Sequence, residues 1–258
     1  ILIFGFFFLG LYDDKYKLSP TKKLFFSLIL ILISISLNQT LKVNEINISF
    51  YGSKIFLESF SLIFTIFCLI ILIYSLNFYD GINGQSCFFF LVVFLFLFII
   101  SSNNEFYLFN IFFLLIVLFL NLKNKVFLGD GGIFLLSMII SVSLIYEHNI
   151  EKNIRFVDEI FFLLLLPGFD LVRLTLKRIL NGKNAFTGDR DHLHHLINRK
   201  FSLSFTNLIL IFYAIIPVIL FSYFSINSFY IFIVFIFLYI SLILVFKSND
   251  QKYNYRKK

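Results

Sequence analysis

The chain has 258 residues, a formal net charge of +7 and 59% hydrophobic residues. Soluble globular domains are typically about 45–50% apolar, so this chain has too few polar residues to cover a surface that faces water. The composition excludes an ordinary soluble domain and predicts an all-α, polytopic integral membrane bundle. The two cysteines are too few for a disulfide framework or a zinc site.

Apolar runs follow one another along the chain and end at polar or Gly/Asn-rich residues. They cover residues 1–11, 24–37, 56–76, 87–101, 106–122, 132–146, 159–174, 205–223 and 228–246. Because a helix crosses a bilayer with about 20 apolar residues, we predict about nine transmembrane segments in one domain, residues 1–258. The first run begins at Ile1 and is too short for a crossing, which indicates an N-terminally truncated chain.

The segment 38–55 separates two of these runs and alternates Ile46, Ile48 and Phe50 with other residues. Such alternation is typical of a strand with one apolar face. We expect the segment either to form a short hairpin or to lie on the membrane surface.

The basic residues divide unequally between the two sides that alternating crossings create. One side holds 18 of the 22 Lys and Arg residues, in or beside segments 12–23, 123–131, 175–204 and the tail. Cytoplasmic loops are enriched in Lys and Arg, so this side is predicted to be cytoplasmic. Every Asp except Asp158 lies on this side, whereas every Glu lies on the other. An Asp-only inner face indicates a metal or phosphate site.

Two polar clusters occupy the inner ends of early runs. Asp13 and Asp14, in LYDDKYKLSPTKK, are adjacent carboxylates whose repulsion can raise one pKa and create a base; the alternative is a charged helix cap. In NFYDGINGQ, Asn77 and Asp80 are one helical turn apart, and the glycines allow a ligand to approach the backbone. Asp-Gly and Asn-Gly are also typical of an ordinary turn.

A third cluster, VFLGDGGIF, places Asp130 between glycines at the start of an apolar run. A carboxylate beside the free N–H groups of a helix N-terminus can hold Mg²⁺ and its phosphates. Simple capping is the commoner use of such an Asp.

The fourth cluster, NAFTGDRDHLHHLINRK, contains His192, His194 and His195, three of the four histidines of the chain. Neutral histidines are ligands of zinc, but the neighbouring cations would compete with a metal and favour an anion. These cations are Lys183, Arg190 and Arg199. The alternative is that residues 175–204 form a solvated cytoplasmic loop without a binding role.

All four clusters lie on the side that the Lys and Arg count makes cytoplasmic. Together they predict phosphoryl transfer between a soluble phosphate compound and a membrane-borne acceptor. An intramembrane prenyltransferase would need two Asp-rich helical motifs of the Asp-x-x-x-Asp type, which the chain lacks. A transporter or lipid flippase would carry polar residues at the bilayer midplane and repeated halves, and UMP release distinguishes it from a transferase.

Over about residues 5–200 the chain resembles the polyprenyl-phosphate N-acetylhexosamine-1-phosphate transferases. GLYDDKYKLSPTKKL resembles their paired-Asp loop, NFYDGINGQ their Asn-x-x-Asp-Gly motif and FLGDGG their Phe-x-Gly-Asp loop. PGFDLVRLTLKRILNGKNAFTGDRDHLHHLI resembles their Pro-x-x-Asp helix and His-x-His-His loop. The His-Leu-His-His sequence in this last segment resembles the branch that starts O-antigen (lipopolysaccharide) and teichoic-acid synthesis, rather than the phospho-MurNAc-pentapeptide transferases.

The resemblance implies a role for each candidate residue. Asp130 would bind Mg²⁺, or Mn²⁺, with help from Asn77, and Asp13 or Asp14 would deprotonate the lipid phosphate. The remaining candidates contact substrate: Phe127 stacks on uracil, Asp80 positions the nucleotide, and Lys23, His192, His194 and His195 bind phosphate oxygens. The chain departs from the family pattern at Asn83, where a second Asp is common, and at Gly131-Gly132, where a Ser is common.

The implied reaction transfers N-acetylhexosamine 1-phosphate from a UDP-sugar to undecaprenyl (polyprenyl) phosphate and releases UMP. UDP-GlcNAc is the default donor, and a modified UDP-N-acetylhexosamine is the alternative. A one-step displacement and a route through an aspartyl intermediate both remain open. The implied location is the bacterial inner membrane, with the active site cytoplasmic. No nucleic-acid partner is expected, and a homodimer stays open.

Overall fold

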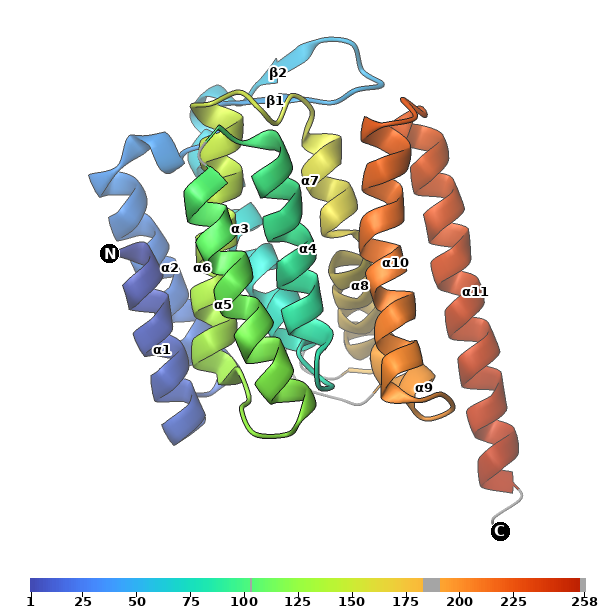
Figure 1. Ribbon diagram of the computed structural model, residues 1–258. Helices are drawn as coiled ribbons and strands as arrows, with labels where there is room; N and C mark the ends of the chain where they lie inside the picture. The colour runs from blue at the N-terminus through green and yellow to red at the C-terminus, as the bar shows by residue number, and fades with distance from the viewer. Residues whose placement is uncertain (103, 183–190, 256–258) are drawn as a thin grey trace.

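The computed structural model describes residues 1–102, 104–182 and 191–255 as a helical bundle with one small hairpin (Figure 1). The helices are α1 (Leu2–Tyr16), α2 (Pro20–Leu37), α3 (Ser61–Tyr79), α4 (Gln85–Ile100), α5 (Asn104–Leu122), α6 (Gly129–Asn149), α7 (Val157–Leu163), α8 (Leu165–Leu180), α9 (Leu193–Asn198), α10 (Leu203–Ser222) and α11 (Ser228–Tyr255). Two 3₁₀ turns, Gln39–Leu41 and Glu58–Phe60, flank the strands β1 (Glu45–Asn47) and β2 (Lys54–Phe56).

Six helical segments of the described chain are long and apolar enough to cross a membrane. They are Pro20–Leu37, Glu58–Tyr79, Asn104–Leu122, Gly129–Asn149, Leu203–Ser222 and Ser228–Lys247. The apolar helix Gln85–Ile100 is shorter. The protein is therefore a polytopic helical membrane protein, as predicted, but the predicted number of nine crossings is not confirmed.

The run 159–174, which we predicted as one crossing, is divided between α7 and α8. The break lies at Leu164, whose φ of −93° and ψ of 4° are not helical. Pro167 explains it, because a proline has no N–H to donate and its ring collides with the carbonyl four residues earlier, here that of Leu163. The break lets α8 follow a separate course and bring Asp170 toward the inner end of the bundle.

The hairpin alternative for residues 38–55 is confirmed. Strands β1 and β2 are antiparallel, with Glu45 opposite Phe56 and Asn47 opposite Lys54. The hairpin lies at one end of the bundle, whereas α9 and the loops after α1, α3 and α5 lie at the other (Figure 1). The predicted polar clusters thus share the end opposite the hairpin, called the inner end below.

Helices α1 and α6 pack closely at the inner end. A Cβ added to Gly10 of α1 would lie only 2.5 Å from the carbonyl oxygen of Asp130 in α6. Farther along the pair, Phe6 and Phe134 are fully buried, with their rings edge to face at 6.0 Å. Glycine therefore allows a backbone approach that places the end of α1, with Asp13 and Asp14, beside the start of α6.

A cleft of about 770 Å³ lies between α4, α7 and α10 toward the hairpin end. Its walls are apolar side chains such as Phe96, Leu163 and Val218, and Arg155 and Glu159 contribute polar groups. The cleft shows that the helices diverge where α7 is short and α4 ends.

Candidate active site

Asp130 is the centre of a cluster that unites four predicted residues. Its Oδ2 atom lies 2.7 Å from Nζ of Lys23, and its Oδ1 atom accepts a 2.9 Å hydrogen bond from Nδ2 of Asn77. Lys23 also forms an ion pair with Asp13. Helices α1, α2, α3 and α6 each contribute one of these side chains, so the sequence-distant motifs do meet. We call Asp13, Lys23, Asn77 and Asp130 the carboxylate cluster.

Asp14 adjoins this cluster but points its carboxylate at the backbone. Oδ1 accepts the N–H of Asp130 at 2.9 Å, and Oδ2 accepts the N–H of Gly131 at 3.0 Å. Asp14 thus caps the N-terminus of α6 from another helix, where a negative charge also complements the helix dipole. Gly129 has a φ of +61°, and a Cβ there would lie 2.7 Å from the Asp14 carboxylate. Position 129 therefore requires glycine, both for its positive φ and for the close approach of the Asp14 carboxylate.

Solvent access in the carboxylate cluster increases toward Asp130. The side chains of Asp13 and Lys23 are 8% and 13% exposed, whereas that of Asp130 is 30% exposed. The Lys23 ammonium stands between two carboxylates and lies 5.5 Å from the centre of the Phe134 ring, within cation–π range. The surroundings therefore stabilise a cation, and an incoming ligand reaches the cluster from the Asp130 side.

The loop between α3 and α4 carries Asp80 to the rim of this region. Its Oδ1 atom accepts a 2.6 Å hydrogen bond from Oγ of Ser86. Although the residue has open surface, desolvation by the surrounding protein raises the pKa of its carboxyl, and the charges of Asp130 and Asp14 raise it further. Asp80 is thus electrostatically linked to the carboxylate cluster.

Asparagines fix the loops on both sides of Asp80. Asn121 accepts the N–H of Gly84 at 2.6 Å and donates to the carbonyl of Val126 at 2.8 Å. Asn83, which stands where the family often has Asp, donates to Asn124 in the neighbouring loop. The departure at residue 83 therefore has a structural role. Asn207 of α10 donates to the backbone carbonyl of Asn83 at 2.9 Å.

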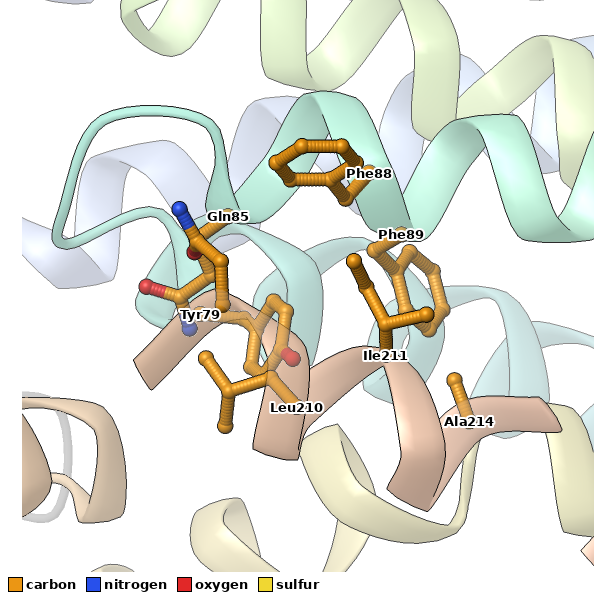
Figure 2. A pocket seen from close by; sticks show the side chains of 8 residues that line it. Tyr79, Gln85, Phe88, Phe89, Leu210, Ile211 and Ala214 are labelled. Atoms are coloured by element: carbon orange, nitrogen blue, oxygen red, sulfur yellow. The ribbon is translucent and has the colours of Figure 1, made fainter. Parts of the chain in front are cut away.

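A small cavity of about 10 Å³ lies behind this loop, between α4 and α10 (Figure 2). Gln85 and Asn207 line it together with apolar residues such as Phe89 and Leu210. Neither amide atom of Gln85, nor the amide oxygen of Asn207, has a hydrogen-bond partner among the described residues. Buried polar atoms are normally paired, so this is the least satisfied part of the inner end.

Phe127 lies in the loop before α6, three residues from Asp130. Its side chain is 67% exposed. An exposed aromatic beside a polar cluster is available for stacking on a planar ligand. The site residues predicted on the first three motifs are thus all found at the inner end.

The histidine segment, residues 192–195, packs on α8 through Asp170, the Asp of the Pro-x-x-Asp motif, to which our sequence analysis gave no role. Oδ2 of Asp170 lies 2.9 Å from Nδ1 of His192 and accepts the N–H of Leu193 at 3.1 Å. Oδ1 accepts from Tyr239 of α11 at 2.7 Å and from Arg173 at 2.6 Å. An Asp at the end of an apolar run is a signal that could have revealed it, since ionisable residues at such depth are usually functional.

His194 is almost fully buried, and neither ring nitrogen has a hydrogen-bond partner within the described ranges. Burial lowers the pKa of His194 well below its ordinary value, and the nearby His195 and His192 lower it further. The ring is therefore neutral at physiological pH. It also contacts Gly81, where an added Cβ would overlap Nε2 of His194. This contact joins the Asp80 loop to the histidine segment.

The three histidines are close together, as predicted. The rings of His192 and His194 are stacked at 5.3 Å, and those of His194 and His195 lie 4.2 Å apart. Asp170, His192 and His194 offer potential metal ligands within 4.8 Å of one another. However, each oxygen of Asp170 already has two hydrogen-bond contacts. One of the four is with the positively charged Arg173, and a cation at this distance disfavours a metal ion. The predicted cations Lys183 and Arg190 lie outside the described residues.

Residues 1–148 match the family described as glycosyl transferase family 4. The chain belongs to glycosyl transferase family 4. The match covers the first three motifs of this family 4 protein and confirms the family resemblance. The chain is also similar to a protein of Bacillus subtilis (strain 168) named probable undecaprenyl-phosphate N-acetylglucosaminyl 1-phosphate transferase. The two are 24% identical over 226 residues, which cover 80% of this chain and 59% of the length of that relative.

Proposed function

We propose that this chain transfers N-acetylhexosamine 1-phosphate from a UDP-sugar to a polyprenyl phosphate and releases UMP. One observation carries the proposal: side chains from four helices meet at Asp130, beside exposed Phe127 and at the same end as the histidines. That arrangement offers carboxylates, cations and a stacking ring, which suit a nucleoside diphosphate and a phosphorylated acceptor. The name of the B. subtilis relative supports GlcNAc 1-phosphate as the transferred group. A modified N-acetylhexosamine is the second choice.

Asp130 is proposed to hold Mg²⁺, with Asn77 assisting and Mn²⁺ as a substitute. The residues fit this ion, because Mg²⁺ binds to proteins through one or two carboxylates and takes other ligands from water and phosphate. The Lys23 ammonium between Asp13 and Asp130 already marks the place as one that stabilises a cation. When bound, the ion would neutralise charge on the diphosphate and on the leaving UMP.

Of the two candidate bases, the geometry favours Asp13. Both oxygens of Asp14 already accept backbone N–H groups at the start of α6, so this carboxylate is engaged in capping the helix. Asp13 instead pairs with Lys23. When Lys23 turns to a phosphate oxygen of the substrate, the Asp13 carboxylate becomes available to the acceptor. The acceptor oxygen then attacks the β-phosphorus of the donor in one displacement.

The other candidates are proposed to bind the donor. Phe127 stacks on uracil, Asp80 orients the nucleotide, and His192, His194 and His195 face phosphate oxygens. His194 is neutral and can donate only one hydrogen bond, so it contributes shape and a dipole, while Lys23 supplies charge.

Release of UMP is the decisive assay. The full chain, in liposomes with polyprenyl phosphate, should release UMP from UDP-GlcNAc in the presence of Mg²⁺. A transporter or flippase would move its substrate without releasing UMP. A panel of UDP-sugars identifies the donor, and absence of UMP with every donor would refute the transferase.

We propose that the inner end faces the cytoplasm and that the membrane is the bacterial inner membrane. The excess of Lys and Arg at that end supports this orientation. Single cysteines in a background without Cys68 and Cys87 test it with an impermeant reagent in intact cells. Labelling near His195 from outside would overturn the orientation, whereas labelling near Lys54 from outside is expected.

A further inference from the structure

His192 has two stacked ring partners and a hydrogen-bond partner at one edge of its ring. Phe78 stacks on it at 6.1 Å with a 25° interplanar angle, and His194 stacks at 5.3 Å with a 17° angle. At the edge, Nδ1 meets Asp170 at 2.9 Å. A flip of the ring would break the Nδ1 contact with Asp170, and a tilt would disturb the stacking on Phe78 and His194.

The identity of the partner at Nδ1 decides where the proton of His192 lies. Asp170 accepts hydrogen bonds from Arg173, Tyr239 and the N–H of Leu193, so its carboxylate is ionised and can only accept from Nδ1. Nδ1 must then carry a proton. Among the described residues, Nε2 of His192 has no hydrogen-bond partner, and this is the edge left for a ligand.

We propose that Asp170 is a positioning residue that keeps the proton of His192 on Nδ1 and offers Nε2 to a phosphate oxygen. With its proton held on Nδ1, the unprotonated Nε2 can accept a hydrogen bond from a protonated phosphate oxygen. This inference deepens the proposed function and rests on it for the identity of the phosphate.

Arg173 and Tyr239 connect Asp170 by hydrogen bonds to the last helix, α11. Arg173 donates to Asp170, to the backbone carbonyl of Asp191 and, through Nε, to Tyr239 at 2.6 Å. Tyr239 in turn donates to Asp170. Helices α8 and α11 and the segment before α9 are thus fixed to one carboxylate, which makes α11 part of the support for His192.

Nitrogen-15 NMR can read the proton position directly, because the chain has only four histidines. The full chain is labelled with ¹⁵N-histidine in lipid nanodiscs, and His192→Gln identifies the signal. At high pH we expect a protonated Nδ1 and an unprotonated Nε2 at His192. In Asp170→Asn, where the amide can donate to Nδ1, the proton should move to Nε2. A wild-type His192 with its proton on Nε2 overturns the proposal, even if the variant does not fold.

Kinetics distinguish this proposal from the proposed function. Asp170→Asn should lower kcat by about a hundredfold or more, the usual range for losing one acid–base or hydrogen-bonding group. Tyr239→Phe, which leaves Oδ2 untouched, should lower kcat less than about tenfold. Ser241→Ala, an exposed control on the same helix that bonds only its own backbone, should match the wild type.

Failure of the proposed function and failure of the positioning role give different results. If the wild type releases no UMP but shows Nδ1 protonated only when Asp170 is present, the proposed function fails and the positioning stands. If UMP is released and Asp170→Asn keeps both the kcat and the His192 signal of the wild type, the positioning fails and the function stands.

Discussion

The carboxylate cluster and the histidine segment lie at the same end of the bundle but are built differently. In the former, Asp130 is partly exposed and forms a 2.7 Å ion pair with Lys23. In the latter, Asp170 and His192 are buried, and Asp170 is fixed by four donors. We propose that the first exchanges its cation, whereas the hydrogen bonds of the second hold its side chains in place.

The difference suggests a division of labour. A site that binds and releases a metal–nucleotide complex must let one cation replace another, and a lysine that can swing between carboxylate and phosphate permits this. A site that recognises phosphate must instead hold its donors in place before the ligand arrives. The predictions below test each half of this comparison.

The largest effect is expected for Asp130→Asn, which keeps the size of the side chain but removes its charge. Turnover should fall by about a thousandfold or more, because metal stabilisation of transition-state charge contributes several kcal/mol. Mg²⁺-dependent binding of UDP-GlcNAc, measured by calorimetry, should also be lost.

Asp14→Asn is the matched control, since its carboxylate lies beside the same backbone. It should retain Mg²⁺-dependent binding and lose about 1 kcal/mol of stability, because the amide nitrogen of Asn cannot accept the second backbone N–H that Asp14 accepts. Equal and undiminished binding in both variants would contradict the roles given to Asp130 and Asp14.

A second prediction concerns the contact that joins the two regions. Gly81→Val should lower UMP release by about a hundredfold, because the new side chain displaces His194, and misplacing a group by about 1 Å can cost this much. Mn²⁺ binding at Asp130, followed by electron paramagnetic resonance, should persist. Gly168→Ala is the control, since a Cβ there meets nothing within 4 Å. If Gly81→Val retains full turnover, the two regions work independently.

A third prediction tests the exchange of cations. Lys23→Gln removes the ammonium between Asp13 and Asp130, so Mn²⁺ should bind in the absence of nucleotide about tenfold more tightly, the effect of about 1.4 kcal/mol. Lys22→Gln, beside it in the sequence but without an ion pair to either carboxylate among the described contacts, should not change this affinity. A weaker affinity in Lys23→Gln would show that Lys23 helps to hold the metal.

The smallest effect is expected behind the Asp80 loop. Gln85→Met should leave the unfolding temperature unchanged or raise it slightly, because it replaces buried amide atoms without partners by a side chain of similar size. Asn207→Leu should destabilise by about 1 kcal/mol or more, since it removes the hydrogen bond to the carbonyl of Asn83. A marked fall in the unfolding temperature of Gln85→Met would show that the amide of Gln85 is hydrogen-bonded in solution.

The sequence predicted the helical membrane fold and most of the first site because both depend on local patterns. Apolar runs indicate helices wherever they occur, and Asp130 stands out between glycines. The break at Leu164 was missed, although Pro167 was visible, because a continuous apolar run outweighed a single proline. Transmembrane helices often tolerate proline, so the sequence alone does not decide between a kink and a break.

The pairing of Asp170 with Tyr239 could not be found by the same reasoning. Their meeting depends on how α8 and α11 pack, across 69 residues of sequence. No local spacing encodes that contact. The role of Asp14 was only half visible: a helix cap was among the alternatives, but the capped helix begins more than a hundred residues later, at Gly129.

Helix α4 has 16 residues, or about 24 Å at 1.5 Å per residue, against a hydrocarbon thickness of about 30 Å. It begins directly after the loop of Asp80 and Gly81, so a thicker bilayer would draw that loop toward the hydrocarbon or force the membrane to thin around it. Hydrophobic mismatch of this kind costs a fraction of a kcal/mol per ångström. The conformation of the inner loops should therefore depend on lipid chain length: reconstitution in long-chain lipids should strain these loops, and short-chain lipids should relax them.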